Sequence, residues 1–361
     1  MSIPREVELA FLCNEPILLM GPPGVGKTRG FEAFFKKNNV VHYTMILSIH
    51  EPADISGQPV MNQALGTYSL APGAWVRTLQ GAAAQGFRTA LLLDELTTAP
   101  PSMQAGALRV ITDRMLGDEK LPDNCWIVAA ANPPEIAANG YELSGPLANR
   151  FAHFTHNFKA LDWVMEFPMY WGDAPAIPGI DPIRWAGARG KIAAFLSART
   201  GQIISFPKDA SQASGPWPSP RTWDKASRFL SVANDVDDAL GAIAGCVGHA
   251  VALEFVNFMK NADLPDPEFL LKNPDKFEIP KKRGDITFAV LSSLHTAIST
   301  KNDAARYAAI WKILGMVSKA GLTDIAICWA KPLASMMPKG AVPPKEALEF
   351  TTIMKEANIR N

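Results

Sequence analysis

The feature that most constrains this chain is a glycine-rich segment of eight residues between a short apolar run and a helical pattern. The segment reads Gly-Pro-Pro-Gly-Val-Gly-Lys-Thr and fits GxxxxGK[ST], with Ile17 to Met20 before it and the helical pattern Thr28 to Lys37 after it. Glycines let successive backbone N–H groups turn toward phosphate oxygens, and a helix N-terminus adds its positive end. The sequence therefore predicts a phosphate-binding loop formed by Gly21, Pro22, Pro23, Gly24, Val25, Gly26, Lys27 and Thr28.

Two carboxylates extend this predicted site. The apolar run Leu91 to Leu93 leads directly into Asp94 and Glu95, and ligands of open α/β sheets bind where parallel strands end. We expect Lys27 to reach the β- and γ-phosphates of ATP, and Thr28 and Asp94 to hold Mg²⁺. Glu95 would act as the general base on the attacking water. Alone, an apolar run before Asp-Glu also describes an ordinary strand end at the surface.

Asn132 is the third candidate, because it follows the apolar run Trp126 to Ala131. An amide at this strand end would orient the attacking water between Glu95 and the γ-phosphate. The alternative is an asparagine in a turn before proline.

The rest of the chain divides by pattern. Short apolar runs alternate with helical patterns from Pro16 to about Phe151, which is typical of βαβ units and a parallel sheet. A segment rich in Pro, Gly and Trp follows, and the pattern is helical from Arg221 onward. We predict an α/β nucleotide-binding domain at 1–157, a linker with one helix at 158–220, and an all-α lid with a C-terminal helical region at 221–361.

Composition narrows the function classes. The chain has 35 Lys and Arg residues and 35 Asp and Glu residues, so its net charge is zero. Because it lacks an overall positive charge, we do not expect nucleic acid to be its main partner. The four cysteines are far apart and form no metal-binding spacing, which suggests reduced thiols. No apolar run approaches the length of a membrane span, and the first residues do not resemble a secretory leader. We expect a cytoplasmic protein without a membrane partner.

In this order, the phosphate loop, Asp94-Glu95, Asn132 and Arg150 resemble an AAA+ ATPase, a P-loop fold of three layers. The finer pattern resembles the MoxR family of the helix-2-insert clade. Four segments carry that likeness, and Ser219-Pro220-Arg221 resembles a further family motif. These four are Pro52 to Gly57, Ala71 to Ala74, Leu93 to Pro101 with Gln104 to Leu116, and Leu143 to Phe151, and Ala130 to Pro133 resembles the family's sensor strand.

The resemblance implies roles for three residues. Asn132 would be the sensor amide, Arg150 an arginine finger that enters the neighbouring subunit's site, and Arg221 a second sensor on the lid. Two alternatives stay open: Arg150 pairs with a local carboxylate, or Arg221 is a solvated residue at a helix start. Asn149 and Leu96-Thr97-Thr98 depart from the family's usual residues.

The resemblance also implies a function. The chain would be an ATPase that binds ATP and Mg²⁺ in a hexameric ring and remodels or activates a partner protein, in the manner of a chaperone. A protein with a von Willebrand factor A domain would be that partner. A nucleic-acid-stimulated motor and a slow nucleotide-gated scaffold are the alternatives. Tyr68 and Trp75 are aromatic candidates for contact in the insert, and a hairpin is expected around Leu116 to Lys120.

Overall fold

The computed structural model of the protein describes residues 4–133, 136, 140–169, 177–207, 209–261, 265–280 and 283–358, and the structural statements below refer to these. They form two compact units, 1–158 and 159–361, each described by itself. In the described part of the chain, no helix is long and apolar enough to cross a membrane.

The first unit is built on a parallel sheet of five strands in the order β2-β5-β8-β1-β9. Four of these strands correspond to the short apolar runs that predict strands in the sequence, namely Ile17 to Met20, Val40 to Leu47, Ala90 to Leu93 and Trp126 to Ala130. β9 was not predicted, because it is short and three of its four residues are exposed. The strands are β1 (Ile17–Met20), β2 (Val41–Ile46), β5 (Thr89–Asp94), β8 (Cys125–Ala131) and β9 (Ala152–Thr155).

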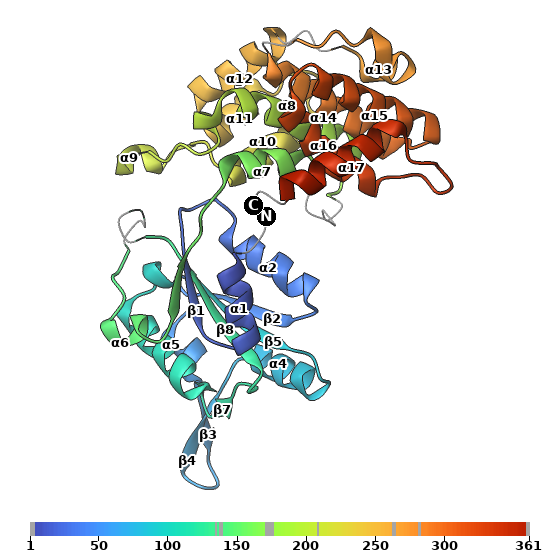
Figure 1. Ribbon diagram of the computed structural model, residues 1–361. Coiled ribbons are helices and arrows are strands. Elements are labelled where there is room, and N and C mark those ends of the chain that lie inside the picture. The colour runs from blue at the N-terminus through green and yellow to red at the C-terminus, as the bar shows by residue number, and fades with distance from the viewer. Residues whose placement is uncertain are drawn as a thin grey trace. The chain divides into compact units, whose positions relative to one another are not determined.

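Helices cover both faces of this sheet, so the predicted three-layer domain with a parallel sheet is confirmed (Figure 1). Alternate strand residues face opposite layers: Leu18 packs in the core with α4 and α5, whereas Leu19 packs in the core with α1 and α2. The second core centres on Trp126, whose ring lies edge-on to Phe11 and Phe35. The helices are α1 (Arg5–Cys13), α2 (Lys27–Lys37), α4 (Ala74–Ala84), α5 (Pro101–Asp113) and α6 (Gly145–Ala148).

Two hairpins meet in this unit, where the turn of one contacts the base of the other. The insert contains α3 (Pro52–Ser56) and the hairpin of β3 (Gln58–Asn62) and β4 (Thr67–Ala71), which extends away from the sheet (Figure 1). The hairpin expected around Leu116 is present as β6 (Met115–Leu116) and β7 (Glu119–Lys120). Its Asp118 N–H donates to Leu70 O over 2.9 Å, and Leu70 N–H donates to Asp118 Oδ2 over 2.6 Å. Gly117 is required there, since its φ is +59° and a Cβ would lie 2.4 Å from Leu70 O.

The second unit is all helical, as predicted for its C-terminal region, but it includes the segment that we expected to be a linker. The residues from Ile192 to Leu196 in α8 are fully buried, so this helix runs through the interior of the unit and packs on α10 and α14. At Gly190, a Cβ would lie 2.2 Å from Ser292 Oγ of α14. The helical pattern from Asp238 to Asn261 predicts one helix, whereas the structure has two, separated at Gly248, whose φ is +90°.

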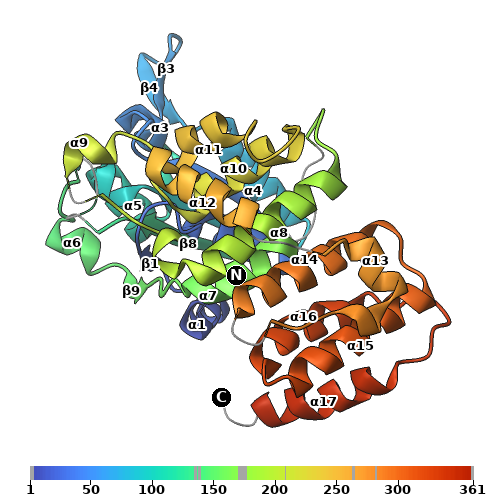
Figure 2. The same cartoon turned by 90° about the horizontal axis from the view of Figure 1, so that it is seen from above.

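Figure 2 shows α15, α16 and α17 of this unit side by side. Its described helices are α7 (Ala160–Glu166), α8 (Pro182–Ala198), α9 (Ala210–Ala213), α10 (Pro220–Val232), α11 (Leu240–Val247), α12 (His249–Asn261), α13 (Pro267–Lys272), α14 (Gly284–Thr300), α15 (Ala304–Lys319), α16 (Thr323–Ser335) and α17 (Lys345–Asn358). Short 3₁₀ turns are η1 (Leu96–Thr98) in the first unit, and η2 (Phe167–Met169), η3 (Thr200–Gln202) and η4 (Pro274–Lys276) in the second.

Candidate nucleotide site

The glycine-rich loop joins the end of β1 to the start of α2. Gly21 N–H continues the sheet by donating to Ala131 O over 3.2 Å. Gly24 and Gly26 have φ values of +78° and +89°, which residues with a Cβ rarely adopt. Successive N–H groups in such a turn form a concave site for anions, and the eleven-residue α2 begins directly after it. The loop therefore has the backbone geometry that a phosphate group needs.

The Lys27 ammonium lies at the centre of this loop. It donates to Gly21 O over 2.8 Å, to Pro22 O over 2.9 Å and to Asn132 Oδ1 over 2.8 Å. The side chain is largely buried, with 9% of its surface exposed. An ammonium has three N–H donors, so these three contacts use its full capacity. A nucleotide phosphate that binds Lys27 must compete with at least one of these oxygens.

Thr28 and Asp94 meet beside the loop. Thr28 Oγ1 donates to Asp94 Oδ2 over 2.6 Å, although 66 residues separate them in the chain. The other carboxylate oxygen of Asp94 accepts from Glu95 N–H over 2.9 Å. Magnesium prefers hard oxygen ligands and is usually held by one or two side chains together with phosphates and water. A hydroxyl and a carboxylate beside a phosphate loop fit that donor set.

Glu95 has an unusual backbone and a partner that the sequence did not reveal. Its φ is +59°, in the left-handed region that favours glycine. Its backbone carbonyl accepts from Thr98 Oγ1 over 2.9 Å, which holds the turn after β5. Its Oε2 accepts a hydrogen bond from Ser48, an exposed residue that follows β2. Because β2 flanks β5 on the side opposite β8 and β1, Ser48 draws the carboxylate away from the loop's side of the sheet.

Asn132 is held from two directions. Its side chain accepts from Lys27, and its backbone carbonyl accepts from Thr97 Oγ1 over 2.8 Å. Thr97 is fully buried, and its own carbonyl accepts from Tyr141 N–H over 2.6 Å. Thr97 is one of the residues that depart from the family pattern, and here it anchors the end of β8. The structure thus brings Lys27, Thr28, Asp94, Glu95 and Asn132 together at one sheet edge.

Among the described residues of the first unit, Arg150 has its hydrogen bonds outside this cluster, and Arg221 belongs to the second unit. Arg150 follows α6 and is exposed; its Nε donates to Thr112 Oγ1 over 3.3 Å, and an Nη atom lies 3.5 Å from Pro146 O. Arg221 is an exposed residue in the first turn of α10, in the second unit. That turn is closed by a capping box between Ser219 and Thr222.

The two aromatic candidates of the insert differ in their surroundings. Trp75 stacks on Tyr43, with ring centroids 4.4 Å apart and planes inclined by 4°. Its ring therefore packs within the first unit. Tyr68 on β4 is 64% exposed, and the apolar side chains of Val60, Met61 and Leu65 are exposed on the same hairpin.

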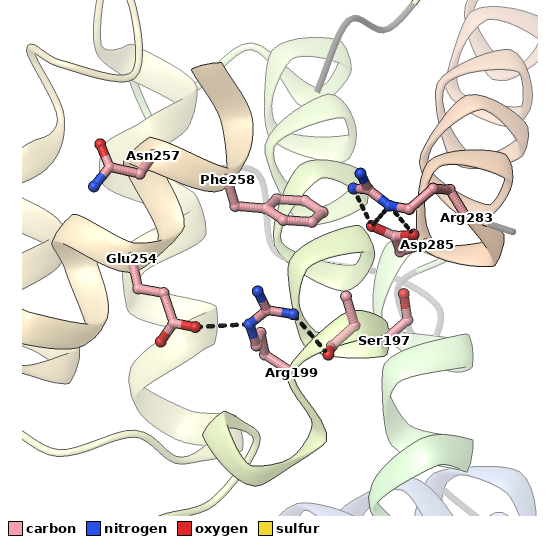
Figure 3. Close-up of a pocket in the computed structure, with 8 residues that line it drawn as sticks. Ser197, Arg199, Glu254, Asn257, Phe258, Arg283 and Asp285 are labelled. Atoms are coloured by element: carbon pink, nitrogen blue, oxygen red, sulfur yellow. Dashed lines mark hydrogen bonds and ion pairs between the residues drawn. The ribbon is translucent and has the colours of Figure 1, made fainter. Parts of the chain in front are cut away.

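The second unit contains a polar cavity of about 610 Å³. Figure 3 shows Arg199 and Arg283 at its wall, each beside a carboxylate. Arg199 Nε donates to Glu254 over 2.7 Å, and Arg283 donates to Asp285 over 2.7 Å. The charges of the described lining residues cancel in pairs, so the cavity lacks the excess positive charge that a triphosphate requires.

One comparison with known protein families matches the part of the chain that contains this site. Residues 16–151 match the family model described as AAA domain (dynein-related subfamily). No curated protein sequence matched the chain.

Three similar solved structures have low scores. A Cytophaga hutchinsonii protein that is provisionally named an ATPase has 16% identity, covers 68% of this chain and 80% of its own, and has a TM-score of 0.31. The Thermotoga maritima RuvB Holliday junction branch migration motor has 15% identity, coverages of 81% and 80%, and a TM-score of 0.34. A point mutant of RuvB has 14% identity, coverages of 82% and 81%, and a TM-score of 0.35. These scores are too low to support a conclusion about this chain.

The family model covers the sheet from β1 to the residue before β9, and with it the loop, both carboxylates, Asn132 and Arg150. Residues 16–151 are therefore similar to the AAA domain of the dynein-related subfamily, and this similarity covers the candidate nucleotide site.

Proposed function

We propose that the chain hydrolyses MgATP as one subunit of a MoxR-like AAA+ ring and uses the energy to remodel or activate a partner protein. The observation that carries this proposal is the bonded cluster at the sheet edge, where Lys27 reaches Asn132 and Thr28 reaches Asp94. A phosphate loop, a hydroxyl with a carboxylate, and a second acid are the parts that phosphoryl transfer to water needs.

Each residue of the cluster has a role in this proposal. The loop N–H groups and Lys27 bind the β- and γ-phosphates, and Thr28 with Asp94 would hold Mg²⁺. The ion neutralises charge on the phosphates when it is bound. Glu95 takes the proton of the attacking water once its carboxylate leaves Ser48, and Asn132 orients that water.

The proposal assigns Arg150 to the site of a neighbouring subunit. Its exposure at the surface of the first unit supports this role, since a side chain on the surface can reach another copy. A guanidinium supplied in trans stabilises the charge that develops on the transferred phosphoryl group, by about 10³ to 10⁵ in rate. A ring, which we propose to be hexameric, would place one such arginine at every site.

The helical unit would act as the lid, and its Arg221 as the second sensor. Nucleotide state would change the angle between the units, and the ring would transmit that change to the partner. Following the MoxR resemblance, we propose a partner with a von Willebrand factor A domain and a cytoplasmic location.

Turnover measured against protein concentration tests the proposal. We expect ATP hydrolysis per subunit to rise steeply with concentration, because a separate subunit lacks its neighbour's Arg150. Lys27→Ala should abolish nucleotide binding, and Glu95→Gln should bind ATP, assemble and fail to hydrolyse it. A flat rate near zero would instead support a nucleotide-gated scaffold.

The Glu95→Gln variant also serves to find the partner, since it should remain in the ATP-bound state. Co-purification with this variant in ATP, with Lys27→Ala as the matched control, should recover a protein with a von Willebrand factor A domain. Strong stimulation of wild-type turnover by single- or double-stranded DNA would contradict the protein-remodelling role.

A further inference from the structure

His156 lies against the phosphate loop at the end of β9. Its backbone N–H donates to Met20 O over 2.7 Å, which extends the β1–β9 pairing by one residue. Met20 directly precedes Gly21, so the backbone bond fixes His156 beside the first residue of the loop. The side chain is buried, with 9% of its surface exposed.

The His156 side chain, Gly21 and the stem of Lys27 are packed together. A Cβ placed on Gly21 would lie 2.9 Å from His156 Cβ and 3.4 Å from Lys27 Cδ. The first distance is shorter than real Cβ contacts, so only glycine fits between the strand end and the loop. A displacement of Gly21 or Lys27 would therefore change the packing around His156.

The ring carries a buried polar atom that needs a partner. His156 Nε2 is shielded from solvent and has no hydrogen-bond partner within the described residues. Buried nitrogen atoms are almost always hydrogen-bonded, and each exception calls for an explanation. Burial first, and the charge of Lys27 second, lower the pKa of His156, so the ring is neutral at pH 7 and offers one N–H and one lone pair.

Nucleotide binding changes the groups around this ring. Lys27 already donates to Gly21 O, Pro22 O and Asn132 Oδ1. When phosphates take up donors of Lys27, a loop carbonyl beside His156 loses its bond, and phosphate oxygens enter the same site. Both are acceptors for an imidazole N–H.

From this arrangement we infer that His156 is a positioning residue of the nucleotide site, and that its Nε2 donates a hydrogen bond to an oxygen there only when a nucleoside triphosphate is bound. The inference rests on the proposed function, because it requires that the loop binds nucleotide. It links occupancy of the loop to β9, the last strand before the chain enters the helical unit.

Nitrogen-15 spectra of the imidazole rings test the inference on protein in which His156 is intact. The His156 signals are assigned by their loss in His156→Gln, and spectra are compared with and without MgATP in the Glu95→Gln background, which prevents turnover. We expect Nε2 to become protonated and its N–H to exchange slowly with water when MgATP is bound. An Nε2 signal that is identical in both states overturns the inference.

Affinity measurements provide the second readout. His156→Leu removes the donor and should weaken MgATP binding about fivefold, the effect of one lost hydrogen bond of ordinary strength. His156→Gln, whose amide can donate from a similar position, should recover most of that loss. His153→Gln on the same strand is the matched control, because the His153 ring is exposed and contacts Ala148 O. Equal affinity in His156→Leu and wild type overturns the inference.

The experiments distinguish a failure of the proposed function from a failure of the role inferred for His156. If wild type binds no MgATP, the proposed function is wrong. If wild type binds MgATP but the His156 signals and affinities do not respond, only the role of His156 is wrong. Should His156→Leu fail to fold, the spectra of the protein with His156 intact and the affinity of His156→Gln still decide.

Discussion

The Lys27 ammonium donates a hydrogen bond to Asn132 Oδ1 over 2.8 Å, across 105 residues of chain. The contact joins the loop after β1 to the end of β8, its neighbour in the sheet. The residue proposed to sense the γ-phosphate and the residue proposed to bind it are thus hydrogen-bonded to each other.

We predict that Asn132→Ala lowers kcat by about 10²-fold, the effect of losing one fixed polar group that acts on the reacting atoms. Nucleotide affinity should change little, since the loop N–H groups and Lys27 remain. Steady-state turnover and equilibrium binding of MgADP measure the two effects. In Asn132→Asp, a carboxylate would pair with Lys27 and repel the γ-phosphate, so this variant should bind MgATP more weakly than Asn132→Ala does.

A second prediction concerns Ser48, which draws the Glu95 carboxylate toward β2. Ser48→Ala removes this restraint, so the basal kcat should rise by up to about fivefold, which corresponds to one hydrogen bond of about 1 kcal/mol. KM should stay the same, because Ser48 belongs to neither the loop nor the magnesium ligands. Ser48→Thr keeps the hydroxyl and is the control. A fall in kcat would mean that Ser48 holds Glu95 in its productive orientation.

The sequence predicted the local parts of this site and missed those that depend on strand order. The glycine loop is contiguous with β1 and α2, and Asp94-Glu95 directly follows an apolar strand, so their placement required no tertiary information. The Ser48–Glu95 contact depends on β2 lying next to β5, which no short motif specifies. A polar residue directly after an apolar strand was the only signal for Ser48.

The differences in the fold have similar causes. β9 pairs with β1 through backbone hydrogen bonds. Its side chains do not alternate clearly between buried and exposed positions, so its sequence has no pattern that predicts a strand. α8 is the one helix predicted within 158–220, but the Pro- and Gly-rich sequence around it suggested a linker. Its central role follows from contacts with α14, about a hundred residues later in the chain, and these are not readable from local composition.

A third prediction tests whether Arg150 acts in trans. Arg150→Ala should bind MgATP normally and lose about 10³-fold in kcat, because the arginine contributes only to the transition state. Mixing it with Glu95→Gln decides the geometry, since neither variant is active alone. If the arginine acts in trans, a mixed ring contains interfaces that combine an intact Glu95 with a neighbour's intact Arg150, and turnover reappears. An inactive mixture of co-assembled subunits would mean that Arg150 acts within its own subunit or through its contact with Thr112.

The last prediction concerns the pH dependence of the helical unit. His295 on α14 packs 5.3 Å from the ring of Trp329 on α16, and burial lowers its pKa from 6.5 to about 4. Between these values the unfolded chain binds a proton that the folded unit excludes, so the free energy of unfolding falls as the pH drops. His295 does not lower the free energy of unfolding above about pH 6.5. Its destabilising effect grows progressively as the pH falls to about 4.

Urea unfolding of wild type and His295→Gln, followed by circular dichroism across that pH range, measures this contribution. Glutamine keeps a polar side chain of similar length but does not titrate, so the variant should lose less stability than wild type as the pH falls. The comparison is made on the slope with pH, because the substitution also changes packing against Trp329 equally at every pH. Identical slopes would show that other groups control the acid sensitivity and that His295 keeps its ordinary pKa in the folded unit.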